Sequence, residues 1–160
     1  LDEALKVAVR AKGLTAQLLA FSRGATSARL IEKDARQAAD IQKYATQFGV
    51  ADKVQVLRAD VYRWAERWVP PGKDPVNLFL SPPFPDLGEK ADEFLALVRT
   101  LLDKAPDDSV LTIQAEDGFP TLRLPDPDAW DVRAYGRNML LFRVKGEAPP
   151  TPAAEPEPAP

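Results

Sequence analysis

Apolar and polar positions follow two different periods along the chain. Short apolar runs at residues 5–11, 28–32, 54–58, 76–80 and 109–114 have the length and composition of buried β-strands. Between these runs, apolar residues recur every three or four positions, which is the period of an amphipathic helix. Strands that alternate with helices in this way favour an α/β fold, in which right-handed crossovers build a parallel sheet between layers of helices.

Polar caps and glycines mark where the helices begin and end. Residues 14–24 predict a helix closed by a glycine, and Asp34 with Gln37 resembles a capping box that starts a second helix. Asp60 can cap a third helix, which ends before Pro70. The apolar faces of the later helices are Ala38, Ile41, Ala45 and Phe48, then Val61, Trp64, Ala65 and Trp68, and finally Phe94, Leu95, Val98, Leu101 and Leu102. Each helix therefore has one face that can pack on a sheet.

The last part of the chain changes character twice. Residues 130–135 and 138–144 are two strand-like runs around a Gly-Arg pair, which predicts an antiparallel hairpin. The segment that follows consists of Pro, Ala and Glu apart from one threonine, and it cannot bury enough surface to fold. We therefore expect one folded domain over residues 1–146 and a disordered tail over residues 147–160.

Composition limits the chemistry that the protein can perform. The 160 residues include no cysteine and no histidine, which excludes disulfides, thiol chemistry, imidazole bases and the usual zinc ligand sets. Any reaction must use carboxylates, hydroxyls, backbone groups or a bound cofactor. No apolar run approaches the roughly 18 residues of a membrane span, and no signal-like segment opens the chain. We expect a cytoplasmic monomer that uses neither a metal nor a membrane.

The formal charge of −3 comes from the tail, because three glutamates lie at Glu147 and beyond, where there is no Lys or Arg. The remaining 21 acidic residues match 21 Lys and Arg, so the body of the chain is neutral. A neutral body can bind RNA only through a local basic patch, since phosphate contacts supply most of the affinity. The candidates are Lys6, Arg10 and Lys12 near the start, and Arg133, Arg137, Arg143 and Lys145 near the end.

Ligands of open parallel sheets bind beyond the carboxyl ends of the strands, so the residues after each strand are the candidate site. After the first two strands these are Lys12 with Gly13, and Glu32. Glu32 follows Gly13 by 19 positions, near the spacing of about 20 at which nucleotide-binding units place an acid on the ribose hydroxyls. The alternative is that Glu32 belongs to a solvated helix entry, and the local pattern favours neither interpretation.

Asp60 and the segment around Lys12 also have two interpretations each. Asp60 follows the third strand, where it either caps a helix or accepts a hydrogen bond from an adenine amino group, and the cap alone explains it. Lys12 and Gly13 are candidates for a phosphate or carboxylate loop. A dinucleotide loop needs two or three glycines, however, and this one has a single glycine, which disfavours a pyrophosphate site.

The tetrapeptide Ser81, Pro82, Pro83 and Phe84 follows an apolar strand directly. Two prolines fix the backbone in an extended form, so that the ring after them is held where the ligand crevice is expected. That ring could stack on a flat base. It could equally be a core residue after a simple strand terminator.

The segments LLAFSRGATSARLIEKD, VQVLRADVYRW, NLFLSPPF and AYGRNMLLFRV occur in the order, and at nearly the spacing, of one protein family. They resemble the bacterial 16S rRNA guanine-N2 methyltransferases of the RsmD type, which are class I S-adenosylmethionine (SAM) enzymes. The likeness covers roughly residues 8–144. It implies a seven-stranded Rossmann-like sheet, mostly parallel with an antiparallel strand in the C-terminal hairpin, and rRNA or the small ribosomal subunit as partner.

The resemblance also implies roles for single residues. It places SAM over the ends of the first three strands, with Glu32 on the ribose, Asp60 on the adenine, and Lys12 and Gly13 at the loop of the first motif. The family's Asp/Asn-Pro-Pro-Tyr corresponds to the tetrapeptide that begins at Ser81. In such enzymes the carboxylate or amide oxygen and a proline carbonyl bind the exocyclic amine, while the ring stacks on the flipped guanine.

Three departures from the family pattern leave two functions open. The acid and both glycines of the first motif are replaced, Ser81 has a hydroxyl where the family has a carboxylate or amide, and only residues 1–6 stand in place of a basic N-terminal segment. Losing one positioned acceptor commonly lowers a rate by about 10² to 10³. The chain is therefore either an RNA methyltransferase or a binding module of the same fold that has lost turnover, for RNA, a protein partner or a small nucleotide. An unrelated nucleotide-binding domain fits the sequence less well.

Overall fold

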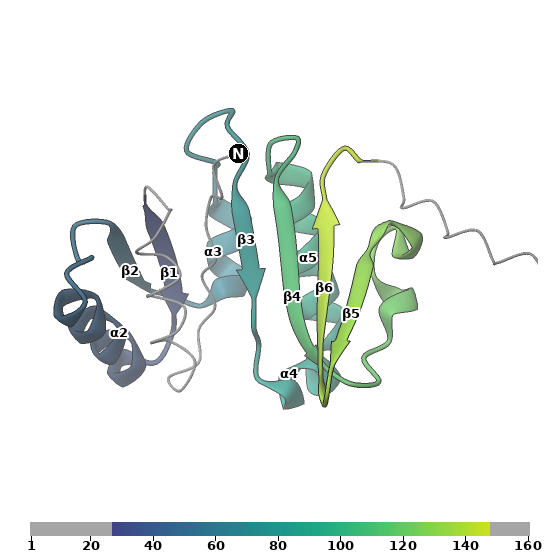
Figure 1. The fold of residues 1–160 in the computed structure, drawn as a ribbon, viewed down its shortest axis with the longest axis horizontal. Coiled ribbons are helices and arrows are strands. Elements are labelled where there is room, and N and C mark those ends of the chain that lie inside the picture. The colour runs from purple at the N-terminus through teal and green to yellow at the C-terminus, as the bar shows by residue number, and fades with distance from the viewer. Residues whose placement is uncertain (1–26, 148–160) are drawn as a thin grey trace, which may run out of the picture.

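Strands and helices alternate along residues 27–147, which are the part of the chain that the computed structural model describes (Figure 1). The strands are β1 (Ala28–Glu32), β2 (Val54–Arg58), β3 (Asn77–Leu80), β4 (Val110–Glu116), β5 (Asp131–Tyr135) and β6 (Asn138–Val144). The helices are α2 (Ala35–Gln47), α3 (Val61–Arg67), α4 (Phe84–Glu89) and α5 (Ala91–Lys104), with single 3-10 turns at Thr121–Arg123 and Pro127–Ala129. The strand predicted at residues 5–11, the helix at 14–24, Lys12, Gly13 and the tail from residue 148 lie outside the described residues.

The described strands form two sheets. β1 and β2 pair in parallel, with Leu30 opposite Val56, and the other sheet has the order β3-β4-β6-β5. In that sheet β3 and β4 are parallel, while β6 runs antiparallel to both of its neighbours, β4 and β5. The last strand is thus inserted between β4 and β5, which confirms the predicted α/β fold with an antiparallel strand in its C-terminal hairpin.

Helix α2 packs on β1 and β2 around a small core. Its buried residues Ile41 and Ala45 meet Leu30 and Val54, as the apolar periodicity predicted. The start of α2 differs in one detail from a capping box. The Asp34 side chain accepts a hydrogen bond from the Gln37 amide at 2.8 Å, but the Asp34 amide donates to Glu32 Oε1, at 2.7 Å, rather than to Gln37. Glu32 therefore closes the cap from the end of β1.

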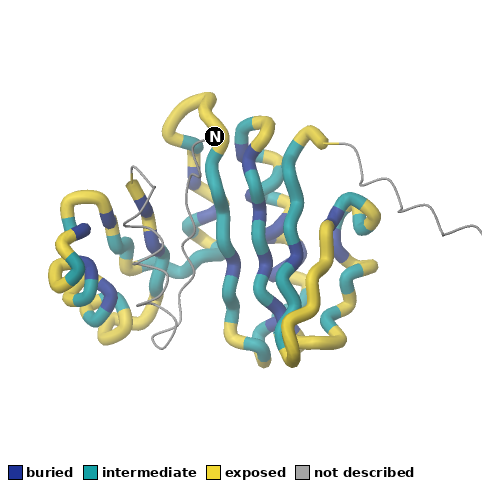
Figure 2. Tube along the Cα trace, viewed as in Figure 1, coloured by how far each residue is buried: buried dark blue, intermediate teal, exposed yellow. Residues whose placement is uncertain are grey.

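Helices α3 and α5 lie on one face of the larger sheet and enclose the main core (Figures 1 and 2). Residues of α5 at the helical period are buried, among them Phe94, Val98 and Leu101, and they face Leu111 and Ile113 of β4. Burying each such side chain stabilises the fold by about 1.5–3 kcal/mol. This core fixes β3, whose carboxyl end carries part of the candidate site, against β4.

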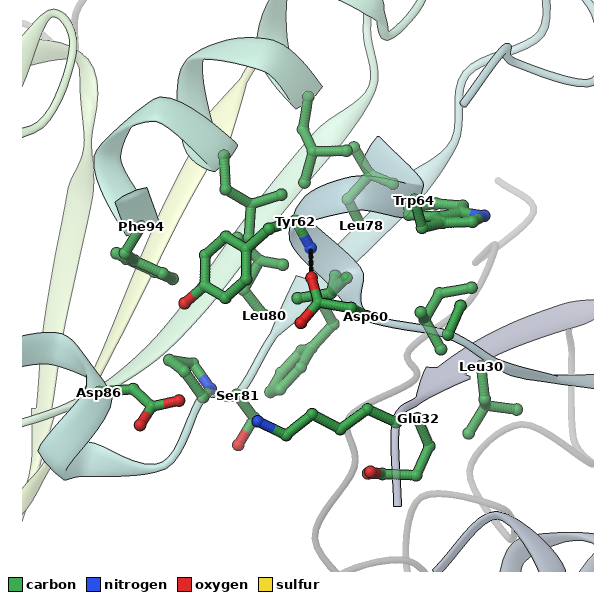
Figure 3. Close-up of a pocket in the computed structure, with 18 of the residues that line it drawn as sticks. Leu30, Glu32, Asp60, Tyr62, Trp64, Leu78, Leu80, Ser81, Asp86 and Phe94 are labelled. Carbon is green, nitrogen blue, oxygen red and sulfur yellow. Dashed lines mark hydrogen bonds between the residues drawn. The ribbon is translucent and has the colours of Figure 1, made fainter. Parts of the chain in front are cut away.

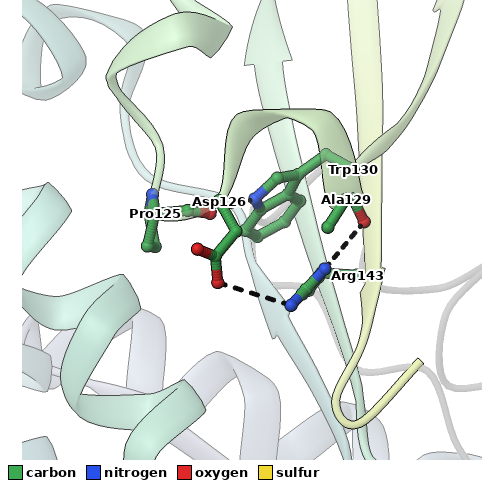
Figure 4. Close-up of polar contacts among 5 residues, drawn as sticks. All are labelled: Pro125, Asp126, Ala129, Trp130 and Arg143. Carbon is green, nitrogen blue, oxygen red and sulfur yellow. Dashed lines mark hydrogen bonds and ion pairs between the residues drawn. The ribbon is translucent and has the colours of Figure 1, made fainter. Parts of the chain in front are cut away.

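Three short elements that the apolar pattern did not predict follow β3 and β4. Helix α4 begins at Phe84 with Pro85 in its first turn, where the fixed φ of proline suits a helix start. The 3-10 turns lie between β4 and β5, and one of them leads into Trp130, whose indole donates to the Pro125 carbonyl at 2.9 Å (Figure 4). Short proline-rich segments of this kind carry no helical period, which is why only the structure reveals them.

Candidate functional site

A cavity of about 550 Å³ lies between β1 and β3 and reaches the carboxyl ends of β1, β2 and β3. Its walls come from most of β1, all of β3 and the residues that follow β2 and β3, together with the first turns of α2, α3 and α4 and the inner face of α5. Figure 3 shows Asp60 near the middle of this cavity, with Ser81 and Asp86 toward one end and Glu32 toward the other. The volume is within the range of about 300–1,000 Å³ that is usual for small-molecule sites.

Glu32 lines this cavity at the end of β1. Its Oε1 accepts the Asp34 amide, and among the described residues its side chain makes no other hydrogen bond. The helix-entry interpretation is therefore confirmed for one carboxylate oxygen. The same side chain also lines the cavity, so the contact with Asp34 orients Glu32 without using its whole capacity as an acceptor.

Asp60, like Glu32, both accepts hydrogen bonds within the fold and lines the cavity. Its Oδ1 accepts hydrogen bonds from the backbone amides of Tyr62, at 3.0 Å, and Arg63, at 3.2 Å, which confirms the predicted cap of α3. Asp60 also lines the cavity, and within residues 27–147 its second oxygen has no hydrogen-bond partner. The cap holds the carboxylate still while one oxygen stays available to a ligand.

Ser81, Pro82 and Pro83 line the cavity directly after β3. The Ser81 hydroxyl donates a hydrogen bond to Oε1 of Gln114, on the adjacent strand β4, at 2.9 Å. Phe84 is placed differently. It is half-buried at the start of α4, packs against the main core, and is not among the residues that line the cavity. The structure thus brings three residues of the tetrapeptide to the cavity, and the stacking role of the fourth stays a prediction.

Tyr62 and Asp86 are cavity residues that the sequence analysis missed. Burial raises the pKa of the Tyr62 hydroxyl above its ordinary value, and the carboxylates of Asp86, Glu93 and Asp60 raise it further. The Lys90 ammonium lies 6.0 Å from the centre of the Tyr62 ring. The neutral hydroxyl can both donate and accept hydrogen bonds at the cavity wall. The sequence feature that could have indicated a role for Tyr62 is its position two residues after the candidate Asp60.

The predicted basic patch near the end of the chain is largely engaged in contacts within the fold. Arg143 donates to the Ala129 carbonyl and pairs with Asp126 at 3.5 Å, with only 14% of its side chain exposed (Figure 4). Lys145 donates to the carbonyls of Asp103 and Ala105 at the end of α5, and Arg133 pairs with Asp131. These cations stabilise the hairpin and α5, which makes them poor candidates for phosphate binding.

The cavity fits the SAM cofactor that the resemblance implies. Ribose hydroxyls and an adenine amino group are hydrogen-bond donors, and Glu32 and Asp60 place carboxylate acceptors in one cavity whose walls include the apolar residues Leu30, Trp64 and Leu78. Lys12 and Gly13 lie outside the described residues, so their part in the site stays a prediction. Residues 27–147 contain no cluster of three or more potential metal ligands and no helix suited to crossing a membrane.

Solved structures of other bacterial proteins share this fold. A conserved hypothetical protein from Streptococcus pyogenes matches with a TM-score of 0.64 and 18% identity, over 83% of this chain and 81% of its own. An rRNA methylase from Streptococcus thermophilus matches with a TM-score of 0.57 and 9% identity, over 78% of this chain and 76% of its own. A methyltransferase from Geobacter sulfurreducens matches with a TM-score of 0.54 and 14% identity, over 84% of this chain and 68% of its own.

Sequence comparison extends the likeness from fold to family. Among curated proteins, no sequence match was found. The model of the family described as "Conserved hypothetical protein 95" matches residues 15–143, which is most of the chain. The protein belongs to this family, that of the RsmD-like methylases.

Proposed function

We propose that the protein is a SAM-dependent methyltransferase that modifies the exocyclic N2 amine of a guanine in small-subunit rRNA, as a cytoplasmic monomer. The observation that carries the proposal is the convergence of Glu32, Asp60 and the Ser81–Pro83 turn on one cavity. Membership of the methylase family supports the reaction type. The resemblance to the guanine-N2 enzymes supports the choice of amine.

The carboxylates hold the cofactor in this proposal. Glu32, oriented by the Asp34 amide, accepts hydrogen bonds from the ribose hydroxyls, and Asp60 accepts one from the adenine amino group. When bound, SAM would supply a methyl group attached to a positively charged sulfur; the sulfur would keep the electron pair of the broken C–S bond, and the methylated amine would release one proton to solvent. Both acceptors are fixed by backbone amides before any ligand binds, which lowers the entropic cost of binding.

The turn after β3 holds the base. The Ser81 oxygen and the Pro82 carbonyl accept hydrogen bonds from the exocyclic amine, and the two prolines keep this turn rigid. The target guanine leaves its stack to reach the turn, as in other enzymes that modify bases. Catalysis by these residues consists of orienting the amine and excluding water, and positioning of this kind can supply a large share of a rate enhancement.

A second candidate is a binding module of the same fold without turnover. The observation that favours it is Ser81, whose hydroxyl stands in place of a carboxylate or amide and is hydrogen-bonded to Gln114. This module would keep the cavity and its two carboxylates and bind RNA, a protein partner or a small nucleotide. The two candidates differ in methyl transfer, whereas both are compatible with cofactor binding.

Calorimetric titration with SAM tests the cofactor site. We expect wild-type protein to bind, and Glu32→Ala to weaken binding by roughly 10- to 100-fold, because a hydrogen bond to a charged group contributes about 1.5–3 kcal/mol. Glu66→Ala is the matched control, since Glu66 is an exposed glutamate on α3 outside the cavity, and it should bind as wild type does.

Methyl transfer from labelled SAM to a small-subunit rRNA fragment then separates the two candidates. Transfer by the wild-type protein supports the enzyme. Binding of SAM without transfer, by the wild type and by Ser81→Asp, selects the binding module. No binding at millimolar SAM contradicts the proposed enzyme.

A further inference from the structure

The hydrogen bond between Ser81 and Gln114 joins the ends of two adjacent strands. Leu80 is the register partner of Ile113 in the parallel ladder of β3 and β4, so the next residues along, Ser81 and Gln114, lie side by side on the same face. Both residues are half-buried, and the hydroxyl-to-amide distance is 2.9 Å. Within residues 27–147 the Gln114 side chain makes no other hydrogen bond.

This contact fixes the direction in which the Ser81 hydroxyl can act. A serine hydroxyl has one hydrogen and two lone pairs, and the hydrogen is directed to Gln114 Oε1. Toward any other group the hydroxyl can then only accept. An exocyclic amine that reaches the turn after β3 therefore meets an acceptor, which is what a carboxylate or amide oxygen at this position would also present.

The direction matters because a hydroxyl without a fixed partner can rotate. A rotated hydroxyl could donate its hydrogen to the lone pair of the amine nitrogen, and that lone pair must stay available if the nitrogen is to accept a methyl group. Gln114 removes this competing arrangement. A glutamine suits the task because its Oε1 accepts a hydrogen bond without adding a charge to a half-buried site.

We propose that Gln114 is a positioning residue of the methyl-transfer site, an inference that rests on the proposed function. By accepting the hydrogen of the Ser81 hydroxyl, Gln114 makes the Ser81 oxygen the acceptor for the exocyclic amine. The alternative is a purely structural link between β3 and β4. The two differ in what the loss of Gln114 changes: a structural link would lower the SAM affinity together with kcat, whereas the positioning role lowers kcat alone and requires serine at position 81.

The test compares Gln114→Met in two backgrounds, with serine or asparagine at position 81. Methionine keeps the length of the side chain and removes the acceptor. Asparagine brings its own carbonyl oxygen and needs no partner to act as an acceptor. We measure kcat and KM for transfer to the rRNA fragment at saturating SAM, and the SAM dissociation constant by calorimetry. Gln42→Met, an exposed glutamine on α2 outside the cavity, is the matched control.

We expect Gln114→Met to lower kcat by up to about 100-fold when residue 81 is serine, with the SAM affinity unchanged, because a misdirected Ser81 hydroxyl misplaces the reacting amine. In the Ser81→Asn background the same substitution should change kcat by less than about threefold. Gln114→Glu keeps an acceptor oxygen and should retain activity with Ser81, which preserves the test should the methionine variant fold poorly.

Equal losses in the two backgrounds, or a Gln114→Met enzyme with wild-type kcat, would overturn the inference and leave the proposed function standing. A decrease in kcat for Gln114→Glu as large as the decrease for Gln114→Met would overturn the inference as well. If wild type and Ser81→Asn bind SAM and neither transfers methyl, both the inference and the proposed enzyme fail.

Discussion

Single carboxylates at the cavity have two tasks each. Asp60 caps α3 with one oxygen and lines the cavity, and Glu32 accepts the amide of Asp34, the cap of α2, while it lines the same cavity. A cap of this kind contributes about 0.5–2 kcal/mol to stability, so neither residue depends on a ligand for its position. A cap and a binding group are therefore compatible interpretations of one aspartate or glutamate, rather than exclusive ones.

Tyr62 provides a pH-dependent measurement of the same cavity. Burial and the carboxylates of Asp86, Glu93 and Asp60 raise its pKa above the ordinary 10.0, with Lys90 the cation that lies near its ring. A raised pKa means that the folded state binds the proton more tightly than the unfolded state. The resulting stability is fully present below pH 10 and is lost as the pH rises through the folded pKa of Tyr62.

We expect Asp86→Asn to lower the Tyr62 pKa toward its ordinary value, because it removes a negative charge that opposes the tyrosinate. Ultraviolet absorbance of tyrosinate measures the titration, and Tyr62→Phe identifies the share that belongs to this residue. Asp52→Asn, an exposed change away from the cavity, should leave the titration as it is. An unchanged Tyr62 pKa in Asp86→Asn would show that the charge of Asp86 does not contribute to the shift.

Residue roles were predictable where they depend on local sequence. Glu32 ends β1 and Asp60 comes shortly after β2, and parallel strands place such residues at one edge, so their convergence could be expected from the chain alone. Gln114 could not be assigned in that way, because its partner Ser81 is 33 positions earlier and the pairing depends on β3 and β4 being neighbours. Asp86 lies on α4, which the sequence pattern did not predict.

At the scale of elements, one lysine links two helices. Lys104, in the last turn of α5, donates hydrogen bonds to the carbonyls of Ala65, at 2.9 Å, and Glu66, at 2.6 Å, near the end of α3. These carbonyls belong to the last turn of a short helix, where a cation also interacts favourably with the helix dipole. The contact fixes α3, and with it Asp60, relative to the main core.

Lys104→Met should lower the free energy of unfolding by about 1–2 kcal/mol, since it removes charge-assisted hydrogen bonds while keeping the aliphatic part of the side chain. Urea unfolding followed by tryptophan fluorescence measures the change. Arg99→Met is the control, because Arg99 is exposed on the same helix and has no hydrogen bond or ion pair to another described residue. Equal stability of the two variants would mean that the Lys104 contacts contribute little in solution.

At the scale of the whole molecule, the described residues 27–147 form two hydrophobic cores of unequal size (Figure 2). The smaller one, between α2 and the β1-β2 pair, is formed by Ala28, Leu30, Ile41, Ala45, Val50 and Val54. The larger one surrounds α5 and contains most of the buried aromatic residues. The cavity lies where the two parts meet, since Glu32 ends β1 and Asp60 follows β2, while Ser81 follows β3.

This division predicts unequal protection of backbone amides from hydrogen exchange. Local opening costs less where less apolar surface is buried, so amides of β1 and β2 should exchange faster than those of β4, whose Leu111 and Ile113 are fully buried in the main core. Mass spectrometry of peptides from the two regions measures the difference. Equal protection would mean that the two parts open together.

A bound cofactor should reduce this difference, because opening of β1 and β2 destroys the site that Glu32 and Asp60 form. Ligand at 100 times its dissociation constant stabilises the closed form by about 2.7 kcal/mol, so exchange in β1 and β2 should slow by up to roughly 100-fold with SAM. Exchange in the Glu32→Ala variant should change far less at the same SAM concentration. Slower exchange confined to β4 and β6 would instead place the ligand away from the two carboxylates.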